Sequence, residues 1–298
     1  MDELGYRPNM VARSLRRSKT ETYGLISDAV SITRFASGIL RGALRESFER
    51  DHVLLIAETD GDPERERRAV ESLLDRGVDG IIFAAQKSRK AHTFALPPSL
   101  PRVNVNLSHA EHAIAIVPDE FAGGRIAVRE LIEAGHRNGI ALIGHDLRQP
   151  MDDELALTAR RRLDGIASEM ATGGLEFAAQ VFCSDWQTEQ GFAATRQVLG
   201  QVTPTALLCL NDRIAFGAYQ ALSEADLAIP EDVSVVSFDD DEISAVLRPG
   251  LTTVAIPHER MGALAVEVIS GEHDDVEDIL VPMQLQLRHS IGAPTDRR

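Results

Sequence analysis

The sequence lacks the features of secreted and membrane proteins. Only two cysteines, Cys183 and Cys209, occur in 298 residues; they could pair with each other, but they are too few for a disulfide scaffold. No apolar run reaches the length that a membrane-spanning helix needs, and residues 1–6 lack the basic and apolar parts of a signal peptide. We therefore expect a protein of the reducing cytoplasm that has no membrane partner.

The sequence also lacks the common catalytic motifs. None of the three lysines follows the glycine spacing of a P-loop, and no Gly-x-Gly-x-x-Gly follows the first predicted strand, which argues against those two nucleotide sites. Neither a Gly-x-Ser-x-Gly elbow nor a His-Glu-x-x-His helix occurs. His109 and His112 flank a glutamate in a polar loop that offers no fourth metal ligand. We expect no enzymatic activity, no cofactor and no metal.

Charge is distributed unevenly along the chain. The net charge is −15, yet residues 1–20 carry five basic side chains and two acidic ones. The acidic remainder would repel nucleic acid phosphates, so any contact with DNA must fall to the basic start of the chain.

Short apolar runs alternate with stretches of helical period, which is the pattern of an α/β protein. A chain of this length exceeds what one hydrophobic core usually supports, so the pattern predicts two parallel sheets. In such sheets ligands bind beyond the carboxyl ends of the strands. The predicted strands are 23–26, 53–57, 80–84, 139–143, 177–182, 206–209 and 233–238. The predicted helices are 38–50, 63 to about 76, 121–134, 161–171, 189–200 and 212–225.

Several short motifs stand in a fixed order along the chain. The first is Leu4-Gly5-Tyr6-x-Pro8-Asn9-x-x-Ala12-Arg13-x-Leu15, and others occupy 77–82, 135–137, 204–206, 211–215, 230–239 and 251–254. Together they resemble the lactose-repressor (LacI) family from its hinge segment to its C-terminus. The resemblance implies two similar Rossmann-like lobes of the periplasmic-binding-protein-like type I fold, each a parallel sheet flanked by helices and joined by crossover strands. It divides the chain into a hinge segment (1–22), an N-terminal lobe (23–136 plus 254–278) and a C-terminal lobe (137–253 plus 279–298).

The resemblance assigns the basic start of the chain to DNA. In the family a hinge helix enters the minor groove of operator DNA, with an apolar wedge that matches Leu15 and basic side chains that contact the backbone. The implied hinge residues are Asn9, Ala12, Arg13, Leu15 and Arg16. The alternative is an ordinary frayed helix with a solvated basic face.

Family members begin with a helix-turn-helix domain, which we expect this chain to lack. Either an upstream segment has been removed or the start codon is assigned too late, and both explanations stay open.

The resemblance places an effector site on the C-terminal lobe. Trp186 matches an aromatic residue that stacks on the ligand, although a Trp packed into the lobe core is the alternative. Arg162 matches an arginine that forks onto ligand hydroxyls or a carboxylate. Asn211 and Asp239 each end a predicted strand, so both side chains could converge on one ligand.

Four further effector contacts are predicted on the N-terminal lobe. Asp28 follows the first strand, and Asn106 follows the run 102–105. Phe35 lies where relatives carry an Asn-Pro-aromatic-aromatic run, from which this sequence departs. Arg34 beside it suggests an anionic group on the effector.

The function implied is a homodimeric transcriptional regulator that binds a small polar effector, such as a sugar or sugar derivative, between its two lobes and so controls operator binding. One alternative is an extracytoplasmic sugar-binding protein of a transporter, which would share the fold. A second alternative is an α/β enzyme with an unrecognised site.

Overall fold

The computed structural model describes residues 19–28, 34–108, 113–149, 157–272 and 278–295. The chain divides into two compact units. Unit 1 comprises Met1–Val117 and His258–Val281, and unit 2 comprises Pro118–Pro257 and Pro282–Arg298. The family resemblance predicts the first boundary after residue 136 instead. The structure moves residues 118–136 into unit 2 because the helix they contain packs closely against a second helix of that unit.

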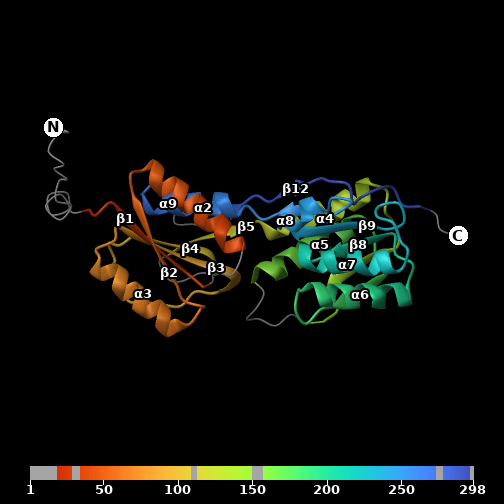
Figure 1. Cartoon of the computed structure of the whole chain (residues 1–298), viewed down its shortest axis with the longest axis horizontal. Helices are drawn as coiled ribbons and strands as arrows, with labels where there is room; N and C mark the ends of the chain where they lie inside the picture. Colours follow the sequence, from red (N-terminus) through yellow and green to blue (C-terminus); the bar gives the residue numbers. More distant parts are fainter. Residues whose placement is uncertain (1–18, 29–33, 109–112, 150–156, 273–277, 296–298) are drawn as a thin grey trace. The chain divides into compact units, whose positions relative to one another are not determined.

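Unit 1 is built on a six-stranded sheet in the order β11-β5-β4-β3-β1-β2. Helices α2 (Arg34–Glu49) and α9 (His258–Ile269) cover one face, and α3 (Pro63–Asp75) covers the other (Figure 1). The strands are β1 (Thr22–Ser27), β2 (Val53–Glu58), β3 (Gly80–Lys90), β4 (Arg102–Ser108), β5 (Ile114–Pro118) and β11 (Ile279–Val281).

The connection between β3 and β4 is unusual for two parallel strands, because residues 91–101 form no helix. Prolines at 97, 98 and 101 would break a helix there. The segment is instead held by side chains. Phe94 stacks on Phe83 with ring centroids 5.7 Å apart, and buried Glu66 of α3 binds Arg89 and His92.

Unit 2 is built on a second six-stranded sheet, in the order β12-β10-β9-β8-β6-β7. Every pairing within it is parallel except β10 with β12. The strands are β6 (Ile140–Gly144), β7 (Ala179–Phe182), β8 (Ala206–Cys209), β9 (Ser234–Asp239), β10 (Thr252–Ala255) and β12 (Gln284–Gln286). The central strands are buried on both faces, as parallel strands between helices must be.

The helices of unit 2 pack in pairs (Figure 1). Helix α4 (Glu120–Glu133) contacts α5 (Leu157–Thr172), and α6 (Thr188–Gln201) contacts α7 (Asp212–Glu224). A short helix, α8 (Glu242–Val246), follows β9. None of the described helices is both long enough and apolar enough to cross a bilayer.

The predicted fold class is confirmed, since each unit is a largely parallel sheet flanked by helices. The six helices predicted between residues 38 and 225 are present, with their starts displaced by at most four residues. Cys183 and Cys209 are both buried and free, so the pairing that the sequence left open does not form.

Candidate functional site

The candidate site lies on unit 2 at the carboxyl edge, by which we mean the edge of its sheet where the parallel strands end. Trp186 follows β7, Asn211 follows β8, and Asp239 is the last residue of β9. Side chains that follow or end three strands of one sheet are thereby gathered at one edge, although only β8 and β9 are direct neighbours. Arg162 reaches the same region from α5.

Arg162 lies in the middle of the groups at this edge, and its side chain is only 4% exposed. Its Nε and Nη2 donate to the two carboxylate oxygens of Glu120 over 2.7 and 2.8 Å. Its Nη1 donates to the Leu210 carbonyl oxygen, and its guanidinium lies 4.4 Å from the centroid of the Phe238 ring. Each contact comes from a different element, so the guanidinium is held in one position.

The charge of Arg162 is maintained by these neighbours. Burial alone would lower the pKa of this guanidinium, but the carboxylates of Glu120, Asp239 and Asp212 raise it overall. A buried charge is tolerated when it is paired and hydrogen-bonded, and breaking such a pair is strongly destabilising. Arg162 therefore serves as a fixed, charged hydrogen-bond donor.

The carboxylate of Asp239 lies beside this donor and has few other favourable contacts. Its carboxylate lies 3.5 Å from Nη2 of Arg162, and no hydrogen bond reaches it from the residues that the structure describes. Burial raises the pKa of Asp239, and the nearby Arg162 offsets this in part. Its φ of +105° is rare for a residue other than glycine, and such backbone strain concentrates at functional sites.

Asp212 was not among the predicted site residues, although the sequence analysis included it in a family motif. It is fully buried and accepts hydrogen bonds from the Ser237 hydroxyl, from Thr253 Oγ1 at 2.8 Å and from the Asp241 backbone N–H at 2.7 Å. Burial raises its pKa to about 7, although these hydrogen bonds lower it. Asp212 thereby ties the end of β9 and the strand β10 to the start of α7.

Asn211 has a structural task at this edge. Its Oδ1 accepts from the Ile214 N–H at 2.9 Å and so caps α7, while its Nδ2 donates to the Trp186 carbonyl oxygen over 3.1 Å. The side chain thus fastens the Trp186 loop to α7. Both polar ends of its amide are engaged within the chain, so contact with an effector stays a prediction for Asn211.

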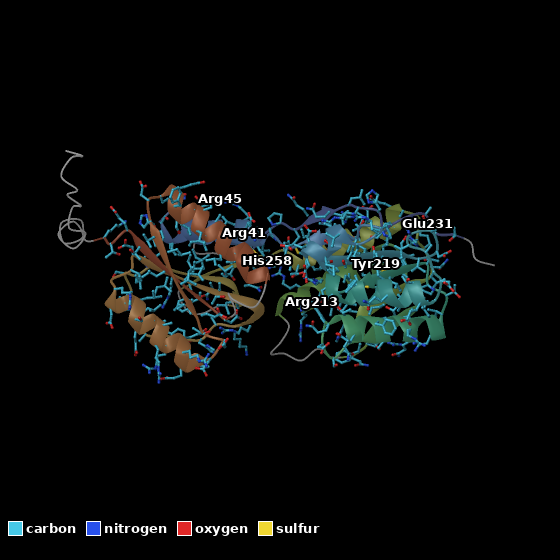
Figure 2. All side chains as sticks on the ribbon, viewed as in Figure 1. Arg41, Arg45, Arg213, Tyr219, Glu231 and His258 are labelled. Carbon is cyan, nitrogen blue, oxygen red and sulfur yellow. The ribbon has the colours of Figure 1, made fainter. Side chains whose placement is uncertain are left out.

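Trp186 is partly buried and packs against the core of unit 2. The residue therefore contacts the core as one reading of the sequence expects, and its stacking on a ligand stays a prediction. Arg213, labelled in Figure 2, lies next to this loop and donates from Nη1 to Gln187 Oε1 over 3.0 Å.

The predicted contacts of the N-terminal lobe belong to unit 1. Asp28 follows β1 and is partly exposed. Asn106 lies within β4 with a φ of +57°, and its Nδ2 donates to the Ala85 carbonyl oxygen over 3.0 Å. Arg34 and Phe35 open α2, but their side chains are not among those described. The effector role of all four stays a prediction, and the hinge residues Asn9, Ala12, Arg13, Leu15 and Arg16 lie outside the described residues.

Glu120 and Arg162 meet because α4 and α5 approach closely. A Cβ at Gly165 would lie 2.1 Å from the Phe121 carbonyl oxygen, and one at Gly124 would lie 2.2 Å from that of Arg162. Only glycine fits at either position. The two glycines therefore bring the first turn of α4, with Glu120, against Arg162.

Within the described part of the chain, no group of three or more potential metal ligands is found. This edge presents the fixed cation of Arg162, the carboxylate of Asp239 and the partly exposed ring of Trp186. Together these three groups can bind a polar molecule.

Comparisons with known proteins show which proteins this chain is similar to. Residues 128–291 match the model of the periplasmic binding protein-like domain. The ribose operon repressor of Escherichia coli (strain K12) is 32% identical over 290 residues, covering 96% of this chain and 84% of the relative. The repressor PurR of Pasteurella multocida (strain Pm70) is 30% identical over 300 residues, covering 98% of this chain and 87% of the relative. A LacI-family regulator structure from Rhizobium etli has 29% identity and a TM-score of 0.78, covering 91% of this chain and 99% of that one.

The chain belongs to the LacI family of transcriptional regulators. The lac repressor dimer bound to operator and an anti-inducer is also similar, with a TM-score of 0.75 and 25% identity over 97% of this chain and all of that one. The LacI-family resemblance predicted from the ordered motifs is thereby confirmed. The part of that expectation concerning a missing helix-turn-helix domain is not tested by these matches.

We expect Gly165→Ala to destabilise unit 2 by about 1–3 kcal/mol, because the new methyl group must push α4 away from α5. Urea unfolding followed by the fluorescence of Trp186, the one tryptophan, measures the change. Gly200→Ala in α6 is the matched control, since a Cβ there meets nothing within 4 Å. It should be neutral or stabilising by up to about 1 kcal/mol. Equal effects of the two substitutions would contradict the close helix contact.

Proposed function

We propose that this LacI-family regulator binds a small hydroxylated effector, of the sugar class, at the carboxyl edge of unit 2. The observation that carries the proposal is the pairing of a fixed donor, Arg162, with a carboxylate acceptor, Asp239, at the end of β9. Each hydroxyl group of a sugar can both donate and accept a hydrogen bond. Asp239 can accept from one such group, and Arg162 can donate to it or to its neighbour. Trp186, from the adjacent loop, offers an apolar ring face to the C–H side of such a molecule.

The relatives support an effector of this class. The Escherichia coli relative is named for the ribose operon, and it aligns with almost the whole chain. That name describes the relative, so the sugar that this chain binds is to be identified by measuring its binding to a range of sugars. No chemistry on the effector is proposed, since the relatives are repressors.

We infer that effector binding controls the affinity for operator DNA. A ligand shifts a conformational equilibrium only when it binds one state better than another, and that difference is the coupling free energy between the two sites. The DNA contacts are assigned to residues 1–22, the basic part of an otherwise acidic chain. Such a regulator would act in the cytoplasm, and it needs no cofactor.

An extracytoplasmic sugar-binding protein is the alternative with the same fold. The curated relatives favour a regulator over this alternative, because they are repressors and they match nearly the whole chain.

A thermal-shift screen of sugars, sugar phosphates and nucleosides tests the proposal. We expect the best sugar, at about 100 times its Kd, to add about 2.7 kcal/mol of stability. Trp186→Ala should remove this shift while the unliganded melting temperature stays within a few °C. Leu287→Ala, an exposed apolar residue of the same unit, is the control and should keep the shift. A normal response of the Trp186 variant would show that the site lies elsewhere.

We also propose that the chain forms a homodimer through unit 1. Helix α2 exposes Leu44 and Phe48, the latter 82% exposed, and the neighbouring edge strand β2 exposes Val53 and Ile56. Exposed apolar groups of this kind mark interfaces, and an unpaired edge strand also favours association. The lac repressor structure cited above is itself a dimer.

Phe48→Glu should convert the dimer to a monomer, because a carboxylate would be buried without a partner in the interface. Sedimentation velocity of the two forms measures this change directly. Ser72→Glu adds the same charge on α3, which lies on the other face of the sheet (Figure 1), and should leave the dimer intact. A wild-type chain that sediments as a monomer would refute the dimer proposal.

A further inference from the structure

The carboxyl edge of unit 2 holds more acid than base. Arg162 is surrounded by Glu120, Asp212 and Asp239, whose charges all act on it. The other ion-paired cations near this edge are already matched, since Arg148 pairs with Asp146 and Arg288 pairs with Asp240. Arg213 also lies near this edge, where it donates a hydrogen bond to the neutral amide of Gln187.

Glu120 and Asp239 compete for the one buried guanidinium, and Glu120 has the better geometry. Glu120 accepts two hydrogen bonds of 2.7 and 2.8 Å, whereas Asp239 stands 3.5 Å away. Glu120 is buried, belongs to the first turn of α4 and lies beside Arg162 because of the glycine contact between α4 and α5. Its carboxylate therefore accepts the two short hydrogen bonds from Arg162 and leaves Asp239 with only the longer ion pair of 3.5 Å.

We propose that Glu120 is a specificity-determining residue: by neutralising Arg162 it makes the site select uncharged, hydroxylated effectors over those that carry a carboxylate or phosphate. This inference rests on the proposed function, since it takes Arg162 and Asp239 to be effector contacts. It differs from the expectation, drawn from Arg34, that the effector carries an anionic group.

The reason is electrostatic. A hydroxyl group can donate to Asp239 and accept from a remaining N–H of Arg162, so an uncharged polyol satisfies both partners. A carboxylate or phosphate can only accept from Arg162, and it meets the repulsion of Asp239 and Glu120 at close range in a poorly solvated site. Repulsion of this kind is how binding sites reject near-identical ligands.

The test compares neutral sugars with their acids by isothermal titration calorimetry. The probes are D-ribose with D-ribonate and D-ribose 5-phosphate, and D-glucose with D-gluconate and D-glucose 6-phosphate. We expect the wild type to bind the neutral member of the better series about tenfold or more tightly than its acids. Glu120→Gln should reduce this ratio by about tenfold or more, because it leaves Arg162 charged and Asp239 as its only strong partner.

Two controls separate specificity from a general loss of structure. Glu120→Asp keeps the charge and should keep the preference for the neutral sugar. Asp164→Asn removes one carboxylate from the exposed side of α5 and should leave the ratio unchanged. If Glu120→Gln fails to fold, Asp239→Asn replaces it. This substitution removes the second carboxylate beside Arg162, so it should also lower the ratio of the affinity for the neutral sugar to the affinity for its acids.

The outcomes distinguish this inference from the proposed function. The role of Glu120 is refuted if folded Glu120→Gln keeps the wild-type ratio of the affinities for the neutral sugar and its acids. The same result in Asp239→Asn refutes it when that variant is the replacement. Neither result contradicts the proposed sugar site. The role of Glu120 is also refuted if the wild type binds the acids as tightly as the neutral sugars. If no probe binds the wild type, the proposed function fails and this inference fails with it.

Discussion

The buried ion pair between Glu120 and Arg162 is the constraint on which the candidate site depends. A charged guanidinium in the interior of unit 2 is acceptable only because a carboxylate, a carbonyl oxygen and an aromatic ring surround it. Those partners come from α4, from the end of β8 and from the end of β9. The pair thereby fixes the elements that present Asp239, Asn211 and the Trp186 loop at one edge.

Much of this arrangement follows from the sequence. The alternation of apolar runs with helical stretches predicts two parallel sheets, and the rule that ligands bind at strand ends singles out Asp239 and Asn211. The glycine three residues after Arg162, Gly165, has a physical reason, since it admits the neighbouring helix that brings a partner for the arginine.

Other parts could not be predicted, and the reasons are physical. Glu120 lies 42 residues before Arg162, and an acidic residue in the first turn of a helix is ordinarily explained by the helix dipole. Gly124 on α4 and Gly165 on α5 were the signal in the sequence that two helices meet there. Asn211 looked like a ligand contact because its task as a helix cap appears only once the turn after β8 is built. The boundary between the units was displaced for the same reason as Glu120 was missed, since both depend on which helix α4 packs against.

The proposed effector site is the carboxyl edge of unit 2. Amide hydrogen exchange, measured with and without the best sugar, tests it most directly, because binding slows local opening where the ligand contacts the chain. The account predicts that protection gathers in the segments 160–165, 184–190, 210–214 and 238–242. Protection confined to other parts of unit 2, with these segments unchanged, would contradict it.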